Sequence, residues 1–241
     1  MSDRRRGADA DDASHFSTAS RPALRAAVEE VSWLLSRGYP REAAVRAAGD
    51  HHQLHARARL AVSRMSVDDA GCVSRAKTRR GLASLGGERV DVDLFNTLVS
   101  LEVLRGGAPS FVGRDGALRD LCGLRGSYRT VDDSAAAIDW LVRCLLEARA
   151  AAITLWIDAP VSNSGRVRAL CEAACEGARA QGCAARVEMV RDADTALVGA
   201  GCVASADGLV IDRASSWVNL PAETWRRWAP EAWVIDLGVA S

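Results

Sequence analysis

The sequence predicts an α/β fold, a parallel sheet flanked by helices and preceded by a small helical domain. Two observations carry this prediction. Apolar residues recur at helical spacing over residues 21–64, and after residue 80 short apolar stretches alternate with segments of helical length. Near-continuous apolar strands separated by helices are typical of parallel sheets that are covered on both faces. A chain of 241 residues is long enough to form one or two domains.

Three helices are expected in the N-terminal domain, residues 21–80. Apolar residues at positions 24, 28, 31 and 35 share one helix face, Gly38 ends that helix and Pro40 opens the next. A third helix is expected to begin at Asp50 as its N-cap and to run to residue 64. The glycine-rich stretch "KTRRGLASLGGE" then marks a domain boundary near residue 80.

Strands and helices alternate in the remaining domain, residues 81–241. The strands are expected at residues 89–95, 152–158, 185–190, 201–205 and 232–236. The helices are expected at residues 134–149, 166–181 and 222–228.

The sequence favours a cytoplasmic protein. Residues 1–20 are polar and charged, which predicts a disordered tail and not a secretory signal. The apolar stretch at residues 150–157 is too short to cross a bilayer, so no membrane association is expected. The seven cysteines form no CxxC pair and lie in apolar segments, as buried thiols of a reducing compartment do.

The charge is unevenly distributed. Residues 21–80 hold 12 basic and 6 acidic residues, although the whole chain has a net charge of zero. This asymmetry indicates a polyanionic partner such as RNA, and Arg57, Arg59 and Arg64 on the third helix are candidates to bind its backbone. Solvated helix faces are the alternative explanation.

Acidic residues cluster at the ends of the expected strands. Asp91 and Asp93 share one face of the first strand, Asp158 closes the second, and Asp207 follows the fourth by one small residue. Ligands of open parallel sheets bind beyond the carboxyl ends of the strands, so these side chains are expected to converge on one crevice. Carboxylates that converge repel each other unless a hard cation such as Mg²⁺ or Mn²⁺ lies among them.

Asp115 and Asp120, in "GRDGALRDL", are candidates for further ligands of the same cation. One or two such ions can activate a water and hold a scissile phosphate, as in metal-dependent nucleases.

Each aspartate also has a structural alternative. Asp91 could pair with a neighbouring arginine, Asp158 could cap the turn before a proline, and Asp207 could start a tight turn. Asp115 and Arg119 could form a surface helix pair at i and i+4. The recurrence of acids at three strand ends favours the functional explanation.

The stretch "APVSNSGR" precedes the helix expected at residue 166. One of Ser162, Asn163 and Ser164 is expected to be its N-cap. With Arg166 in the first turn, this helix N-terminus is also a candidate phosphate site.

The remaining reactive side chains favour structural roles. His51 and His55 lie one helical turn apart, but without a third ligand nearby they are expected to be exposed histidines and not a metal site. Cys202 and Ser205 are expected to pack within a strand. No histidine follows His55, which excludes a Ser/His or Cys/His catalytic pair from the α/β domain.

The stretch "DLFNTLV" is similar to the first motif of haloacid-dehalogenase-type phosphatases. That resemblance implies Asp93 as nucleophile and Thr97 as its support. Phe95 replaces the second aspartate of the motif, however, and Lys77 lies upstream of the position where those enzymes need a lysine. The phosphatase is therefore kept as a third hypothesis.

A second resemblance covers most of the chain. The stretches "VDLFN", "DGALRDL", "GSYRT", "IDAPVSNSGR" and "VASADGLVIDRASSWVNL" resemble the uncharacterised prokaryotic family of domain of unknown function 434. The basic helical segment is similar to the N-terminal part of that family.

The C-terminal part resembles the PIN-like superfamily, in particular its NYN branch. The first strand of that branch typically ends in an Asp–Gly–x–Asn turn, and a later strand ends in small residues followed by aspartate. Asp93, Asn96 and Asp207 match these positions, with Asp158 at the intermediate strand, whereas Leu94 stands where the turn usually has glycine.

The resemblance implies a Rossmann-like sheet and a Mg²⁺- or Mn²⁺-dependent ribonuclease or phosphodiesterase. Asp93, Asp158 and Asp207 would be its acidic core, and Asn96 would orient a ligand or water. The alternative is a PIN-like module that binds RNA or a protein without cutting.

Overall fold

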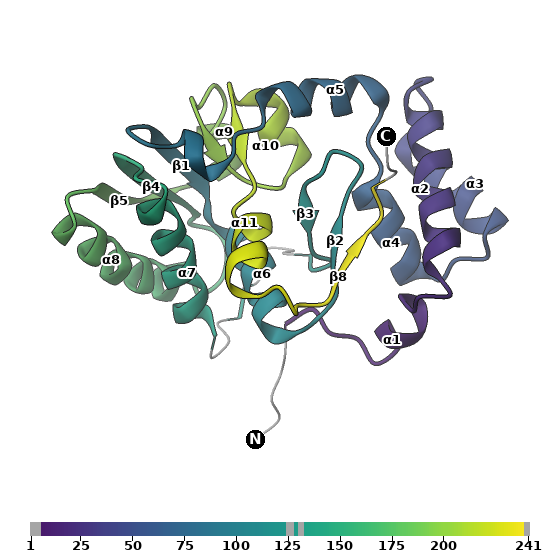
Figure 1. Cartoon of the computed structure of the whole chain (residues 1–241), viewed down its shortest axis with the longest axis horizontal. Coiled ribbons are helices and arrows are strands. Elements are labelled where there is room, and N and C mark those ends of the chain that lie inside the picture. Colours follow the sequence, from purple (N-terminus) through teal and green to yellow (C-terminus); the bar gives the residue numbers. More distant parts are fainter. Residues whose placement is uncertain (1–5, 124–127, 130–132, 239–241) are drawn as a thin grey trace.

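The helical part of the chain precedes the sheet, as the sequence predicts. The computed structural model describes residues 6–123, 128–129 and 133–238, so residues 126, 127 and 130 of the "GSYRT" stretch lie outside the described residues. The first helices are α1 (Asp12–His15), α2 (Arg21–Leu35), α3 (Arg41–His51), α4 (Ala56–Met65) and α5 (Asp69–Thr78) (Figure 1).

The α/β part follows, with strands and helices in alternation. Its strands are β1 (Arg89–Asp93), β2 (Ser110–Val112), β3 (Leu118–Arg119), β4 (Ala152–Asp158), β5 (Ala184–Val190), β6 (Val203–Ala204), β7 (Trp217–Val218) and β8 (Val234–Asp236). Its helices are a 3-10 turn at Leu82–Ser84, α6 (Leu94–Gly106), α7 (Ser134–Glu147), α8 (Ser164–Ala180), α9 (Ala193–Ala196), α10 (Gly208–Arg213) and α11 (Leu220–Trp228).

The main sheet has five parallel strands in the order β5-β4-β1-β6-β7. The chain therefore builds outward from β1 through β4 to β5, and then returns to add β6 and β7 on the other side of β1. The direction of winding reverses between β1 and β6. In open sheets of this kind, ligands bind beyond the carboxyl ends of the strands at such a switch point.

The two faces of the main sheet differ. Val90 and Val92 of β1 lie in the largest core, to which α6, α7, α8 and α11 contribute. The opposite face of β1 carries Asp91 and Asp93. A smaller apolar cluster around Trp217 covers only part of that face. The expectation of near-continuous apolar strands is thus wrong for β1, because valine and aspartate alternate along it. This alternation places the aspartates on the thinly covered face.

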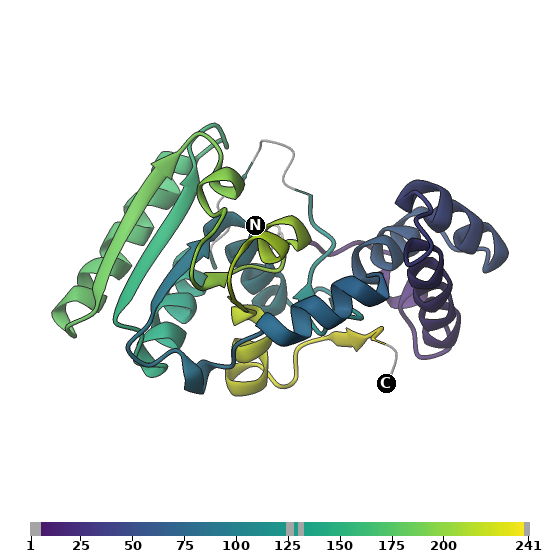
Figure 2. The same cartoon turned by 90° about the horizontal axis from the view of Figure 1, so that it is seen from above.

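The helical part packs on a second, three-stranded sheet of order β3-β2-β8. Leu24 and Val28 of α2 share a core with Phe111 of β2 and Ile235 of β8. Figures 1 and 2 both place α1–α4 at one end of the long axis, the main sheet at the other, and this small sheet between them.

Three local expectations are corrected. The strand expected at residues 232–236 forms β8 in the small sheet, not a strand of the parallel sheet. Asp50 does not start a helix, because α3 continues through it to His51 and His55 is the N-cap residue of α4. Strands β2, β3 and β7 are two or three residues long, too short for a periodic signal in the sequence.

Residues 12–16 of the expected disordered tail are ordered against the small sheet. They form α1, and Phe16 is completely buried with its ring edge-on to that of Phe111, at 4.7 Å between centroids. A single aromatic residue in a polar stretch carries no periodicity, so only the tertiary contact reveals its role.

None of the helices in the described part of the chain is long and apolar enough to span a bilayer.

Phe16→Ala is expected to lower the free energy of unfolding by ~3 kcal/mol, because it empties a fully enclosed site. Urea denaturation measures this. Tyr39→Ala is the control, since that side chain is 54% exposed and should change stability little. Equal effects of the two substitutions would show that the N-terminal segment is not docked.

Candidate functional site

A polar pocket of about 520 Å³ lies where the helical part meets the carboxyl edge of the main sheet. We call it the junction pocket. Five carboxylates line it: Asp120, and four at or after the ends of the parallel strands, Asp93, Asp158, Asp194 and Asp207. Four arginines line the same pocket: Arg41 of α3, Arg64 of α4, Arg75 of α5 and Arg119 of β3.

The ends of β1 and β6 are joined at the switch point by hydrogen bonds. The Ser205 hydroxyl donates to Asp93 Oδ2 at 2.8 Å and accepts from the Asp207 backbone N–H at 3.0 Å. Asn96 Oδ1 accepts from the Ala206 backbone N–H at 2.8 Å. Ser205 therefore has a polar role beyond the strand packing expected from the sequence, and Asn96 holds the loop that carries Asp207.

Asp158 and Asp207 also stabilise the backbone near the pocket. Asp158 Oδ1 accepts from the Ala193 N–H at 2.7 Å, which fixes the start of α9. Asp207 Oδ1 accepts from the Leu209 N–H at 2.8 Å as the N-cap of α10. The structural alternative for Asp207 therefore holds in part, whereas Asp158 stabilises α9 and not the turn before Pro160. Both side chains still line the junction pocket.

The charged forms of Asp93 and Asp194 are destabilised in the junction pocket, by burial first and by neighbouring carboxylates second. Burial raises the pKa of Asp93 to about 7, and the negative charges of Asp194, Asp207 and Asp158 contribute to this rise. The hydrogen bond from Ser205 acts in the opposite direction and lowers the pKa. Burial and the charges of Asp207 and Asp158 also raise the pKa of Asp194. Such mutual repulsion at a cleft is a property of sites that bind cations or transfer protons.

Asp194 is the residue that sequence reasoning missed. It lies in α9, four residues after β5, in the stretch "RDADT". The rule that singled out Asp93, Asp158 and Asp207 applies equally to this strand end, so the signal was present.

The acidic donors of the pocket are carboxylate oxygens, the ligand type that hard cations prefer. No three carboxylate oxygens of this pocket lie within 4.8 Å of one another among the described residues. Mg²⁺ commonly uses one or two carboxylates and retains several waters, and Mn²⁺ favours the same oxygen ligands. Asp93 with one neighbour would contact the ion directly, and the remaining carboxylates would bind through water.

Of the three auxiliary ligands expected from the sequence, the structure brings only Asp120 to the pocket. Asp120 accepts from the Ser100 hydroxyl at 2.6 Å and from the Cys122 N–H at 2.6 Å. Asp91 does not line the pocket, because it pairs with Arg89 at 3.0 Å and accepts from the Trp156 indole at 2.9 Å.

Asp115 also lies outside the pocket lining, where it pairs with arginines. It lies between β2 and β3 with no exposed side-chain surface, bonded to both Arg119 and Arg75 at 2.6–2.7 Å. Burial alone would raise its pKa, but the two guanidinium groups hold that pKa far below its usual range. The i, i+4 pair with Arg119 is therefore real but buried in a hairpin, and not on a helix surface.

The helix N-terminus expected to receive phosphate lies outside the junction pocket. Asn163 occupies the N-cap position of α8, but its side chain donates to the Tyr128 carbonyl and does not cap the helix. The Ser162 hydroxyl bonds to the backbone of Tyr128, and that of Ser164 donates to the Ala159 carbonyl. Arg166 is exposed.

The three arginines expected to contact RNA also separate. Arg64 lines the junction pocket. Arg57 pairs with Asp12, and Arg59 pairs with Asp50 at 2.7 Å. Two of the three guanidinium groups are therefore neutralised within the helical part.

Two other candidates lie away from the pocket. Thr97, the support residue in the phosphatase hypothesis, is buried and donates to the Ala204 carbonyl at 3.2 Å. His55 stacks on His15 with ring centroids 4.8 Å apart, so it is not paired with His51. The seven cysteines are free thiols, five of them buried, as the sequence predicts.

Fold and pocket together define an α/β protein with an acidic crevice at the switch point of its sheet. The chain belongs to the family named domain of unknown function DUF5616, whose model matches residues 82–223. The model of the protein of unknown function DUF434 matches residues 23–77. Membership of an uncharacterised family is confirmed. The family 434 match is narrower than expected, however, because it covers the helical part alone and the stretches from "VDLFN" onward lie within the DUF5616 match.

An uncharacterized protein of Methanocaldococcus jannaschii is a relative of this chain. It is 28% identical over 188 residues, which cover 78% of this chain and 88% of the relative. No solved structure matches the chain significantly.

Asp93→Asn is expected to stabilise the protein above pH 7. The folded-state pKa of about 7 exceeds the ordinary value of 3.8, so the folded state retains a proton that the unfolded chain releases. Stability therefore falls as the pH rises from about 4 to about 7, and asparagine removes this loss of at most ~4 kcal/mol. Urea unfolding at about pH 4 and about pH 8 measures the difference.

Asp115→Asn serves as the comparison, because the pKa of Asp115 is shifted in the opposite direction. Its loss should destabilise the protein at neutral pH by ~3–5 kcal/mol, since two buried guanidinium groups lose their partner. A destabilised Asp93→Asn at about pH 8 would contradict the repulsion among the pocket carboxylates.

Proposed function

We propose that this chain is a Mg²⁺- or Mn²⁺-dependent phosphodiesterase that acts on RNA, with a PIN-like α/β domain. The observation that carries the proposal is the composition of the junction pocket. Four carboxylates gather at the switch point of the sheet, in the same pocket as four arginines. A phosphodiester is the substrate class that matches both signs of charge. The carboxylates would bind a metal cation that contacts the phosphate, and the arginines would donate hydrogen bonds to it.

The residues of the junction pocket would have separate roles in the reaction. A bound Mg²⁺ or Mn²⁺ ion would supply an activated water and neutralise the phosphate. Asp93, the most buried of the four carboxylates, would hold the ion together with Asp207 or Asp158. Ser205 and Asn96 keep the ends of β1 and β6 in register by the hydrogen bonds described above.

Arg41 is the strongest candidate to bind the phosphate. Its guanidinium donates to the carbonyls of Ser63 and Ser66 at 2.6 and 3.0 Å, and it forms no ion pair with any described residue. Burial lowers its pKa, and the neighbouring charges of Arg75 and Arg119 lower it further. A phosphate oxygen would relieve this repulsion and accept the remaining donors.

The strand order supports the PIN-like assignment. Asp93 and Asp158 are the last residues of β1 and β4, and Asp207 follows β6. These are the strands at which the resemblance expects acids, and β1 and β6 flank the switch point. The helical part supplies Arg41, Arg64 and Arg75 to the same pocket, which supports a role of this basic segment in contacting the RNA backbone.

Asp93→Asn and Asp207→Asn are expected to reduce Mn²⁺-dependent cleavage of single-stranded or structured RNA by at least ~100-fold, because each removes a carboxylate of the cation site. Gel assays of labelled RNA with and without EDTA measure this. Asp91→Asn is the matched control on the same strand, since Asp91 is paired outside the pocket. Cleavage unchanged in Asp93→Asn would exclude the proposal, and RNA binding without cleavage by the wild type would favour a binding module.

Arg41→Gln is expected to weaken RNA binding about 3- to 10-fold and to reduce the slope of log affinity against log salt by about 1, as the loss of one phosphate contact does. Filter binding at several salt concentrations measures both. Arg166→Gln is the control, because this arginine is exposed outside the junction pocket. An effect of Arg166→Gln larger than that of Arg41→Gln would instead place the phosphate at the N-terminus of α8.

A further inference from the structure

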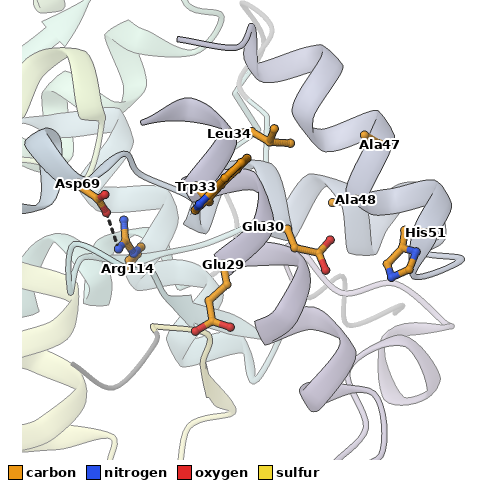
Figure 3. Close-up of a pocket in the computed structure, with 9 residues that line it drawn as sticks. All are labelled: Glu29, Glu30, Trp33, Leu34, Ala47, Ala48, His51, Asp69 and Arg114. Carbon is orange, nitrogen blue, oxygen red and sulfur yellow. Dashed lines mark ion pairs between the residues drawn. The ribbon is translucent and has the colours of Figure 1, made fainter. Parts of the chain in front are cut away.

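A second cavity lies in the helical part, away from the junction pocket. It is a groove of about 740 Å³ between α2 and α3 (Figure 3). Apolar side chains form much of its wall: Trp33, Leu34, Ala47 and Ala48. Glu30 of α2 and His51 of α3 point toward one another across the groove, whereas the carboxylate of Glu29 is turned away from His51 (Figure 3).

Three potential metal ligands converge at this groove. Glu30, His51 and His52 each offer one ligand atom, and these atoms lie within 4.8 Å of one another. No other such set of three occurs among the described residues. His52 Nε2 lies 3.0 Å from Glu30 Oε1, and the two histidine rings are T-shaped with centroids 4.7 Å apart.

The end of α3 explains how two consecutive histidines reach one point. Consecutive residues of a continuing helix point about 100° apart. Here His51 is the last residue of α3 and His52 is its C-cap, with backbone angles that leave the helix. Both residues thus lie at the C-terminal end of α3, where side-chain rotation brings one ligand atom of each within 4.8 Å of Glu30 on α2.

We infer that Glu30, His51 and His52 bind a borderline divalent transition-metal ion such as Zn²⁺. Two imidazoles and one carboxylate suit Zn²⁺ and its neighbours, whereas Mg²⁺ prefers oxygen ligands alone. The site is therefore chemically distinct from the carboxylates of the junction pocket.

The present geometry needs only small side-chain movements to hold the ion. Ligand atoms about 2.0–2.1 Å from a tetrahedral Zn²⁺ are about 3.3 Å apart. His52 and Glu30 already stand at 3.0 Å, so His51 has to approach by about 1.5 Å or less through side-chain rotation. A fourth coordination position remains for a water or a ligand, and it opens toward the groove because Glu30 and His51 line it.

Metal binding would join α2 to α3 directly. A ligand that binds only the folded state raises its stability in proportion to the logarithm of the ligand concentration. Zn²⁺ at about 100 times its dissociation constant should therefore raise the Tm of the full chain by roughly 5 °C or more.

The experiment titrates ZnCl₂ into the EDTA-treated and dialysed full-length protein by calorimetry, and follows the Tm with Zn²⁺ or Mg²⁺. In the Asp93→Asn variant, whose junction pocket has lost a proposed cation ligand, the expected result is one Zn²⁺ per chain and a Tm rise that Mg²⁺ does not reproduce. His51→Gln, His52→Gln and Glu30→Gln should each weaken Zn²⁺ binding at least tenfold. Glu29→Gln and His55→Gln are the matched controls and should bind as the wild type does.

Two outcomes would overturn the inference. One is Zn²⁺ affinity unchanged in His51→Gln and His52→Gln but lost in His55→Gln, which would place the ion at His15 and His55. The other is a Co²⁺-loaded protein with a sulfur-to-metal charge-transfer band, which would place the ion on cysteines. Because Asp93→Asn and Asp207→Asn leave this site intact, Zn²⁺ binding by those variants separates it from the proposed nuclease.

Discussion

The arrangement of the junction pocket depends on one buried carboxylate, that of Asp115, held between Arg75 and Arg119. Arg75 lies on α5 and also pairs with Asp212 of α10 at 2.8 Å. Arg119 lies on β3 and donates to the Ala206 carbonyl at 2.8 Å, next to Asp207. This single network therefore joins the helical part, the β2–β3 hairpin and the loop after β6. Breaking a buried network of this kind leaves unpaired charges, which is why it constrains the surrounding geometry.

Two buried aspartates in and beside the junction pocket have opposite surroundings. Asp115 is surrounded by guanidinium donors, and its negative charge is favoured. Asp93 is equally buried, but its neighbours are a hydroxyl and three further carboxylates, and its negative charge is disfavoured. A fold gains no stability from the second arrangement, so its presence at the switch point of the sheet is best understood as a requirement of function. The contrast distinguishes aspartates that stabilise the scaffold from those that the proposed function assigns to a cation.

The helical part contributes more than basic charge. Its arginines are largely engaged with the protein itself, as the pairs of Arg57 with Asp12 and Arg59 with Asp50 show. Only a few arginines of the helical part reach the junction pocket. Among these, Arg41 has no carboxylate partner among the described residues. A net charge of +6 over residues 21–80 thus overstates the surface offered to a polyanion, because much of it is neutralised locally. The helical part also presents its own cluster of Glu30, His51 and His52, on a different face and of different chemistry.

The sequence by itself determined the order of helices and strands and the position of the acids at strand ends. Both follow from local rules, since apolar periodicity and strand length are properties of short segments. Asp93, Asp158 and Asp207 could be named for this reason, and Asp194 could have been. Partner choice is only partly local. Arg119 and Arg89 lie four and two residues from Asp115 and Asp91, but Arg75 and Trp156, the second partners of these aspartates, come from distant segments. Only the tertiary structure therefore decided which aspartates are neutralised. It also brought Phe16, Asn163 and His52 into contact with residues distant in the sequence.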